Sequence, residues 1–346
     1  MSKLPDLIKL QSALTGAAHD HYRRAGLTHV DVPQIVGVTG ACENIDTLFR
    51  VRSRVPVPLY FSQTGQLCLE QALEHFPGVY TIMHSGRDEE TEDERHLRQF
   101  RLTEEEFDWS LVGGSAAYDE EQMYSALLEH AEAAVKAISK AAIETHADGL
   151  ESAGRDAGGL YASLGLPFHR ISYDDAVRLL NAHGDPVVWG QDLGARQEAT
   201  VVNALNVGRF PRPTFIMRYP KEIKFFNMKV SAADDRVVLS ADLIFPGAGE
   251  GTGAAVREND GERLEKRLLG STMYRLHLER GGTLADFGWY LDLVKSGRTR
   301  PHAGYGIGNE RVMQYLLGGA DIRDCSVLHH LARQTQDWTV RQTVAA

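Results

Sequence analysis

The sequence predicts an α+β fold in which helices flank an antiparallel sheet. Short strand-like segments outnumber those that could serve as crossover helices, which favours an antiparallel sheet over a doubly wound one. The 346 residues, 43% hydrophobic and 24% charged, suffice for the large core of a globular enzyme. No repeat, low-complexity tract or obvious linker divides the chain, so we expect residues 1–346 to form a single domain.

The first elements are predicted from apolar spacing. Leucines and alanines at helical intervals predict a helix over residues 4–25, and Gly26 is a suitable stop. A short strand is expected at residues 29–33, where the chain reaches a proline. Further strands are expected at residues 58–61 and 79–83.

Residues 100–109 alternate with period 2, as a strand does. One face would carry Phe100, Leu102, Glu104 and Glu106. The other would carry Arg101, Thr103 and Glu105. Carboxylates that share a face with an aromatic ring suit the floor of a pocket.

The second half is predicted more coarsely. A helix is expected over residues 119–146, because Asp119 with Gln122 resembles a capping box and a buried stripe follows. The glycine-rich residues 147–168 are interpreted as a surface connection. The remaining expected elements are a helix from Tyr173, strands at 215–217 and 237–245, and a helix at 311–317.

Composition excludes several classes of protein. No apolar run approaches the roughly 20 residues that span a bilayer, and no secretory signal pattern is present, which predicts a cytoplasmic protein with no membrane contact. Three cysteines without a C-x-x-C pair argue against a disulfide framework or structural zinc. A formal net charge of -10 repels nucleic acid on average, although a local basic patch could still bind it.

Two clusters far apart in the chain have the residue types of an ATP site. In the first, Arg87 could clamp an α-phosphate, and Glu89 could accept from an adenine amino group or help to hold Mg²⁺. Arg95 and His96 add phosphate donors, and Phe100 adds a ring for base stacking. An R-x-E pair by itself is more often a surface ion pair, so the first cluster alone is only suggestive.

Two glycine-rich segments complete the pattern. Residues 247–253 lack the Gly-Lys-Ser/Thr of a Walker A loop and could be a flexible loop, but Glu250 could bind Mg²⁺ and Arg257 could clamp a carboxylate. The glycines of residues 304–308 are not a dinucleotide fingerprint, because too little chain follows for a βαβ unit. A close-packed strand-to-helix turn that presents Arg311 fits better.

Together these motifs resemble the signature motifs of class II aminoacyl-tRNA synthetases, and specifically the asparaginyl-tRNA synthetase catalytic domain. Residues 26–33 resemble motif 1, residues 87–97 motif 2 and residues 304–311 motif 3. Five further segments resemble asparaginyl segments: 60–67, 189–194, 219–224, 243–250 and 301–304. The resemblance covers roughly residues 10–325, and the co-linear order of the motifs makes it specific.

The resemblance implies a six- or seven-stranded antiparallel sheet, a homodimer formed through the motif 1 region, and activation of an amino-acid carboxylate by ATP. In the ATP half it implies that Arg87 holds the α-phosphate, while Glu89 and Phe100 contact the adenine. The other implied ATP-binding residues are Arg95, His96, Gly308 and Arg311, with His96 and Arg311 facing the β- and γ-phosphates and Glu250 binding Mg²⁺. For Phe100, a place in the plain core is the alternative.

In the amino-acid half, the resemblance implies that Glu43, Gln66 and Glu104 surround the substrate ammonium group and that Arg257 holds its α-carboxylate. A loop ion pair is the alternative for Glu43. Asn227 stands where the family often has a tyrosine, which would enlarge or repolarise the pocket near the substrate.

Other positions depart from the family pattern. Because motif 1 starts almost at Met1, we expect the chain to lack the family's N-terminal anticodon-reading barrel. Residues 324–329 replace a proline-rich segment that ends in an arginine, and Gln99 replaces a glutamate. Leu69 stands where aspartyl relatives carry a lysine, so a neutral side chain such as that of asparagine is favoured over aspartate, since a buried acid would lack its partner.

The predicted function is an ATP-dependent ligase that adenylates asparagine or a close analogue and transfers the acyl group to a small amine or ammonia. One alternative is aminoacylation of a tRNA or carrier. Another is an asparagine synthetase that uses aspartate and ammonia, as the truncated archaeal relatives do. A third, from a different class, is a regulator that binds ATP or an amino acid without catalysis.

Overall fold

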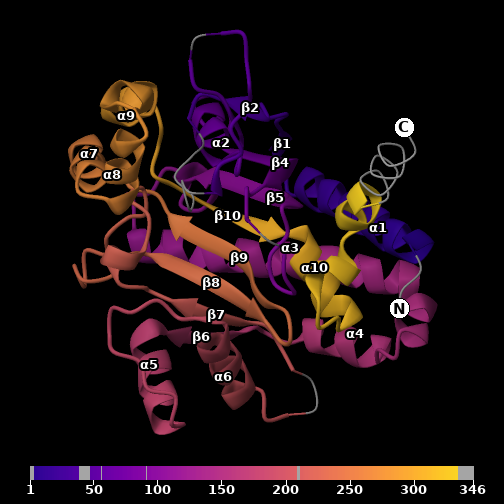
Figure 1. Ribbon diagram of the computed structural model, residues 1–346. Coiled ribbons are helices and arrows are strands. Elements are labelled where there is room, and N and C mark those ends of the chain that lie inside the picture. Colours follow the sequence, from indigo (N-terminus) through magenta and orange to yellow (C-terminus); the bar gives the residue numbers. More distant parts are fainter. Residues whose placement is uncertain (1–3, 39–46, 56, 91, 209–210, 334–346) are drawn as a thin grey trace.

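The computed structural model describes residues 4–38, 47–55, 57–90, 92–208 and 211–333, which fold around one eight-stranded sheet (Figure 1). Neighbouring strands β1 and β4 are parallel, as are β6 and β7, and the other neighbours are antiparallel. The predicted α+β class is therefore confirmed. In sheet order the strands are β1 (Thr28–His29), β4 (Gly78–Gly86), β5 (Gln99–Asp108), β10 (His302–Gly308), β9 (Gly249–Val256), β8 (Ser240–Phe245), β7 (Thr214–Met217) and β6 (His169–Ser172).

Two long helices, α1 (Leu4–Arg24) and α3 (Glu120–Ser152), cover one face of this sheet (Figure 1). Helix α3 begins where Asp119 accepts hydrogen bonds from the backbone N–H groups of Glu121 and Gln122, which is one of the two contacts of the predicted capping box. Its apolar stripe joins the main core with residues of α1, β5, β8, β9 and β10. This leaves the opposite face of the central strands free to form a site.

The remaining helices are shorter and lie around this centre. Helix α2 (Gln66–Ala72) and the two-stranded sheet of β2 (Ile35–Val36) and β3 (Tyr60–Phe61) lie beside β1 and β4 (Figure 1). Helices α5 (Tyr173–Ala182) and α6 (Ala195–Leu205) form a second core with β7 and β8. A third cluster contains α7 (Gly261–Leu269), α8 (Thr272–Glu279) and α9 (Gly288–Lys295).

The prediction of a surface connection at residues 147–168 was wrong. Helix α3 continues to Ser152, past a non-helical residue at His146, and α4 (Ala157–Gly165) follows. The glycines made this segment look like a loop, although α4 begins within it. Asp156 caps α4 by accepting a hydrogen bond from the N–H of Gly159.

The glycine-rich segments are strands rather than loops. Residues 249–256 form β9, so the flexible-loop interpretation of residues 247–253 fails for most of that segment. The glycines after Pro301 belong to β10, a central strand that leads directly into α10 (Asn309–Leu317), as expected for a strand-to-helix turn that presents Arg311. Helices α6 to α9 were not predicted. Among the described residues, no helix is both long and apolar enough to cross a bilayer.

Candidate active site

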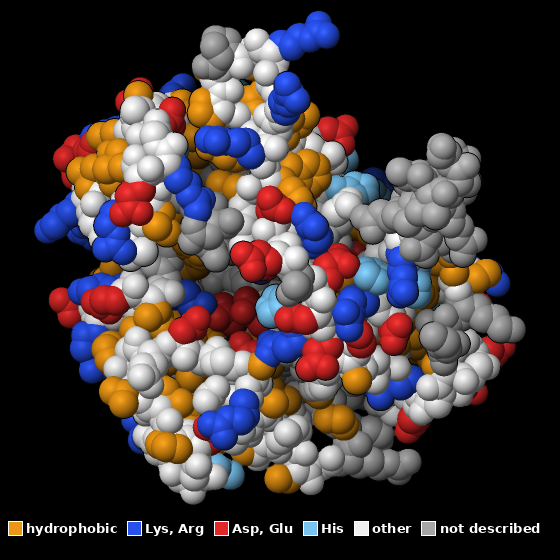
Figure 2. Space-filling model, viewed as in Figure 1, with side chains coloured by type: hydrophobic (Ala, Val, Ile, Leu, Met, Phe, Trp, Pro, Cys, Tyr) orange, Lys and Arg blue, Asp and Glu red, His pale blue; other side chains and the backbone are white. Residues whose placement is uncertain are grey.

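A cavity of about 500 Å³ opens on the sheet face opposite α3. Its wall includes side chains of β5, β9 and β10, together with residues of the loop between β4 and β5 and of helix α6. Figure 2 shows it as a hollow near the centre of the molecule, with acidic side chains at its floor and rim. It is the natural place to look for the residues that the two ATP-like clusters predicted.

The alternation predicted for β5 is confirmed. Phe100, Leu102, Glu104 and Glu106 all line the cavity. On the other face, Glu105 accepts a hydrogen bond of 2.7 Å from His130 of α3. Strand β5 therefore separates the site from the core, and its carboxylates form part of the cavity floor.

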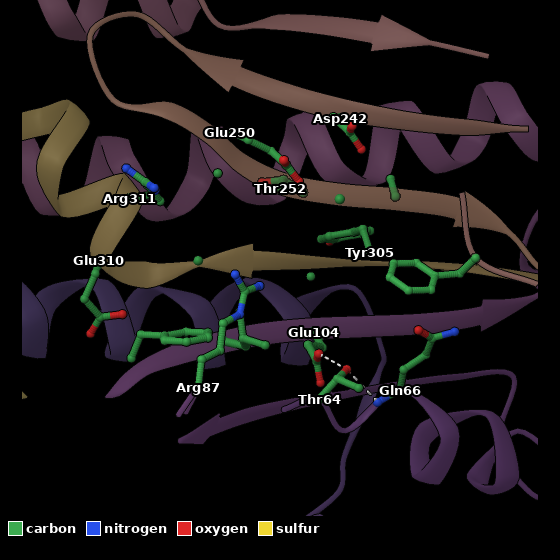
Figure 3. A pocket seen from close by; sticks show the side chains of 18 of the residues that line it. Thr64, Gln66, Arg87, Glu104, Asp242, Glu250, Thr252, Tyr305, Glu310 and Arg311 are labelled. Carbon is green, nitrogen blue, oxygen red and sulfur yellow. Dashed lines mark hydrogen bonds between the residues drawn. The ribbon is translucent and has the colours of Figure 1, made fainter. Parts of the chain in front are cut away.

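The residues expected around the triphosphate gather at one end of the cavity. Arg87, Arg95, His96, Phe100, Glu250, Gly308 and Arg311 all line it. Figure 3 shows Arg87 and Arg311 toward one end of the cavity and Gln66 toward the other, with Glu104 between them. The guanidinium of Arg87 lies 5.6 Å from the centre of the Phe100 ring, so a cation and a flat aromatic surface stand side by side.

Arg311 links α10 to two segments of the site. It donates to the backbone oxygen of Ala248 at 2.9 Å and to that of Arg95 at 2.6 Å. Burial, together with the nearby charge of Arg95, lowers the pKa of Arg311. A ligand anion between these two arginines would therefore relieve a repulsion as well as gain two charged donors.

Between the two ends, Glu104 is held in place by the turn before α2. Thr64 donates its hydroxyl to Glu104, and the N–H of Gly65 donates to the Oε2 atom of Glu104 at 2.7 Å. The carboxylate is almost fully buried and still borders the cavity. It therefore offers a fixed negative charge to a ligand cation.

Gln66 is oriented by a buried network that the sequence did not predict. Its amide nitrogen donates to Glu70 at 2.8 Å, which leaves the amide oxygen of Gln66 for the cavity. Glu70 also accepts from the hydroxyl of Tyr290 at 2.8 Å and from Nε2 of His302 at 3.0 Å. The opposite ring nitrogen of His302 donates to the oxygen of Arg300 at 2.8 Å, so the ring uses both N–H groups.

The charges of this network are paired. Burial alone would lower the pKa of His302, but the hydrogen bond to Glu70 outweighs this effect and raises the pKa. Burial would raise the pKa of Glu70, but His302 lowers it. In the part of the chain that the structure describes, Glu70, Glu106 and His302 are the one group spaced to hold a metal ion. Because three donors already satisfy Glu70, we interpret the group as a hydrogen-bond network.

Arg257 lies at the floor beside this network. It pairs with Glu106 through Nη2 to Oε1 at 2.5 Å and Nε to Oε2 at 3.3 Å. Burial raises the pKa of Glu106 to about 7, although Arg257 counteracts part of this rise. Half of the guanidinium is thus committed to Glu106, and the predicted contact of Arg257 with a substrate carboxylate stays a prediction.

Two predicted site residues do not line the cavity, and the position of a third lies outside the described residues. Glu43 falls outside the described residues. Glu89 follows β4 and does not line the cavity. Asn227 is fully buried and does not line it either, since the wall there is formed by its neighbours Phe225 and Met228. The expected effect of Asn227 on the pocket surface therefore has no support in this geometry.

Three other cavity residues were not predicted. Lys224 donates to Asp242 of β8 at 2.5 Å. Glu198 of α6 has a carboxylate oxygen, Oε2, without a hydrogen-bond partner among the described residues, and its nearest cation is Arg95 at 3.8 Å. Burial, reinforced by Asp242, raises the pKa of Glu198 to about 7. No motif marks Glu198, whose position depends on a helix that was not expected.

Comparison with known proteins agrees with this geometry. The family model described as tRNA synthetases class II (D, K and N) matches residues 1–330. The chain belongs to this family. This confirms the resemblance to class II synthetases and, with it, the prediction of an ATP-dependent ligase.

Several relatives of this class II synthetase chain are asparagine–tRNA ligases. That of Pyrococcus furiosus is 34% identical over 326 residues, which cover 94% of this chain and 68% of the relative. That of Desulforamulus reducens is 35% identical over 319 residues, covering 92% and 67%. The chain thus spans about two thirds of the length of these relatives.

Solved structures give the same result. The asparaginyl-tRNA synthetase of Pyrococcus horikoshii complexed with asparaginyl-adenylate has a TM-score of 0.80 and 32% identity, covering 94% of this class II synthetase chain and 68% of the other. The Entamoeba histolytica asparaginyl-tRNA synthetase in complex with asparaginyl-adenylate, at 24% identity and a TM-score of 0.75, supports the fold alone.

Proposed function

We propose that the protein activates asparagine, or a close analogue, with ATP to form an aminoacyl-adenylate and then transfers the acyl group to a small amine or ammonia. The observation that carries the activation step is the two-ended cavity, which has Arg87 and Arg311 toward one end, Gln66 toward the other and Glu104 between them (Figure 3). Phe100 and Arg257 also line it. The similarity to a synthetase solved with asparaginyl-adenylate supports the same reaction.

In the first step, a carboxylate oxygen of the amino acid attacks the α-phosphorus of ATP, and the bond to pyrophosphate breaks. Arg87 would stabilise the charge on the α-phosphate, while His96 and Arg311 would hold the leaving pyrophosphate. Phe100 would stack on the adenine. In the second step, an amine nitrogen attacks the acyl carbon, AMP leaves, and the amine releases a proton to solvent.

A magnesium ion fits the ATP end of the cavity. Mg²⁺ is commonly held by one or two carboxylates together with substrate phosphates, and Glu250 presents a carboxylate beside Arg311 in the cavity (Figure 3). When bound, the ion would neutralise phosphate charge. Removing the carboxylate in Glu250→Gln should raise the Mg²⁺ concentration that gives half-maximal pyrophosphate exchange.

The amino-acid end favours a neutral side chain. Arg257 with Glu106, and His302 with Glu70, form two balanced pairs. Leu69 is fully buried in a small apolar cluster with Leu73 and Val79, so it supplies no cation where aspartyl relatives have a lysine. A second carboxylate here would be poorly compensated. This supports asparagine over aspartate, and hence argues against an asparagine synthetase that uses aspartate.

The loop between Arg87 and Arg95 supports an amine acceptor. Six of the seven residues 88–94 are acidic, and the loop is bounded by two residues that line the cavity. Carboxylates at the mouth of a site repel nucleic-acid phosphates and attract an ammonium group. Glu90 and Glu94 of this loop are exposed to solvent.

Aminoacylation of tRNA is the second candidate, because the family and the relatives named above are tRNA ligases. Pyrophosphate exchange across the twenty amino acids tests activation: the proposal expects exchange with asparagine and little with aspartate. A mass-spectrometric screen with asparagine, ATP and either an amine panel or tRNA tests the acceptor. Asparaginyl-tRNA without any amide product would favour aminoacylation, and no exchange with any amino acid would exclude both candidates.

We also propose a homodimer formed through the motif 1 region. Ile35 of β2 and Ile8 of α1 are about half exposed, and a second copy seated on this region would cover them. Light scattering after size exclusion should give about twice the chain mass of 38.3 kDa.

A further inference from the structure

We propose that Glu92 and His329 are positioning residues for the ATP-binding loop, residues 87–98. This rests on the proposed function, since it assumes that Arg87, Arg95 and His96 bind ATP. Neither Glu92 nor His329 lines the cavity. They act on it through the backbone of the loop, and His329 belongs to the C-terminal segment that departs from the family pattern.

The C-terminal segment, residues 321–329, contacts the loop at three points. The N–H of Ile322 donates to the oxygen of Glu94 at 3.0 Å. Arg323 donates to the oxygen of Glu92 at 3.2 Å. Nδ1 of His329 lies 2.9 Å from Oε2 of Glu92. Ile322 itself borders the cavity, so the segment and the site are in direct contact.

The side chain of Glu92 connects these contacts to Arg87, the arginine expected to bind phosphate. Its other oxygen, Oε1, accepts from the N–H of Arg98 at 2.9 Å. The oxygen of Arg98 in turn accepts from the N–H of Arg87 at 2.9 Å. One carboxylate thus connects the C-terminal segment, through Arg98, to the backbone of the residue expected to hold the α-phosphate.

Charge explains why the loop needs such a partner. Six carboxylates lie within residues 88–94 and repel one another, so each contact with a donor outside this run stabilises the loop. His329 and Glu92 are 16% and 25% exposed in their side chains, whereas the Arg98–Asp88 pair in the same loop is nearly half exposed on both sides. The more buried contact is less screened by solvent and holds the loop more strongly.

The loop is also held from the other side of the site. Arg311 of α10 donates to the oxygen of Arg95 at 2.6 Å, close to the end of the loop. Residues 321–329 follow α10 directly in the chain. The ATP-binding loop therefore lies between α10 and the segment 321–329 that follows α10. His329 supplies the last of the contacts between that segment and the loop.

His329→Ala and Glu92→Ala should each raise the KM for ATP by about 5- to 10-fold in pyrophosphate exchange, with the KM for the amino acid and kcat within about 2-fold of wild type. His329→Gln keeps a donor for Glu92 and should restore the KM for ATP. The double alanine variant should be no worse than Glu92→Ala, because both residues serve one contact. The control is His277→Ala, which removes the 2.9 Å contact of His277 with Asp286 away from the cavity and should leave the KM for ATP at the wild-type value.

Amide exchange and trypsin cleavage of the loop, both without ATP, keep the test independent of the proposed function. The alanine variants should exchange faster at residues 87–98 and be cut sooner after Arg95 and Arg98, with an unchanged melting temperature. Unchanged loop exchange, or equal effects on both substrates, would overturn the positioning role. If His329→Ala does not fold, Glu92→Gln carries the same comparison. A wild-type protein that exchanges no pyrophosphate would instead refute the proposed function.

Discussion

Single residues in this site were predicted where a motif fixes both the residue type and its neighbours. Arg87 and Arg311 are more than 200 residues apart in the chain, yet both line the same cavity. Glu198 and Lys224 escaped prediction for a physical reason. Each acquires its role only through contacts across the fold, Glu198 with Arg95 and Lys224 with Asp242, and a lone acid or lysine in a sequence carries no such information.

Arg87→Ala should abolish most pyrophosphate exchange while leaving the fold intact. The loss should be on the order of 100-fold or more, because a guanidinium that stabilises developing charge on the α-phosphate would be missing. Arg23→Ala on the exposed side of α1 is the control and should match wild type. Exchange by Arg87→Ala at a rate close to wild type would remove Arg87 from the catalytic site.

Glu198 predicts a stability effect that depends on pH. Its pKa rises from 4.5 to about 7 in the folded protein, so the folded state binds this proton more tightly than the unfolded state. The free energy of unfolding therefore falls as pH rises from about 4.5 to about 7. Glu198→Gln does not titrate, so it should match wild type near pH 5 and be more stable at pH 8, by on the order of 1–3 kcal/mol.

Urea denaturation of both proteins at the two pH values measures this difference. A stability difference that is the same at pH 5 and pH 8 would contradict the assignment, because it would show that ionisation of Glu198 in the folded protein has no special cost.

At the scale of elements, the sequence predicted strands better than the connections between them. The alternation of β5 located the cavity floor correctly, because a strand's period of 2 determines which side chains share a face. Glycine caused two of the errors, at residues 147–168 and at residues 247–253. In residues 147–168 it was taken as a sign of a loop, although the structure has the end of α3 and the start of α4 there. In β9 and β10 it marks strands that pack closely against other groups.

Strand β10 offers a matched pair of glycines. A Cβ on Gly304 would lie 2.1 Å from the carboxyl carbon of Glu106 and 2.4 Å from the backbone oxygen of Glu105. Gly304→Ala should therefore destabilise the protein strongly, because the backbone of a central strand has no room to move. On Gly306 the nearest atom, a carbon of Glu104, would be at 3.4 Å, an ordinary contact.

Gly306→Ala should fold normally but reduce pyrophosphate exchange, since Gly306 lines the cavity. Thermal melting and the exchange assay together separate the two variants. Similar melting temperatures for both would show that close packing at Gly304 is not limiting.

At the scale of the whole molecule, family resemblance supplied what local patterns could not. Periodicity and composition led to an α+β class and one pocket-forming strand. The co-linear motifs brought residues near both ends of the chain into one site, and the structure has them around one cavity. The buried network of Glu70, His302 and Tyr290 was beyond sequence reasoning, because its members come from α2, β10 and α9 and meet only when the domain is complete.

Because the cavity draws on segments from residue 64 to residue 322, a ligand that fills it should stabilise the whole domain. A ligand at 100 times its Kd adds about 2.7 kcal/mol to the free energy of unfolding. For a domain of this size, whose entropy of unfolding is on the order of 0.7 kcal/mol/K, that corresponds to a rise in melting temperature of about 4 °C. We expect such a rise with ATP and a further rise with asparagine. Aspartate should add little, since the paired charges around Arg257 and His302 leave no spare cation for a second carboxylate.

Thermal-shift measurements on wild type, Arg87→Ala and Arg311→Ala test this directly, and both variants should lose the ATP effect. An equal rise with aspartate would contradict the preference for a neutral side chain, whereas a rise with ATP that survives both substitutions would place the nucleotide elsewhere in the molecule.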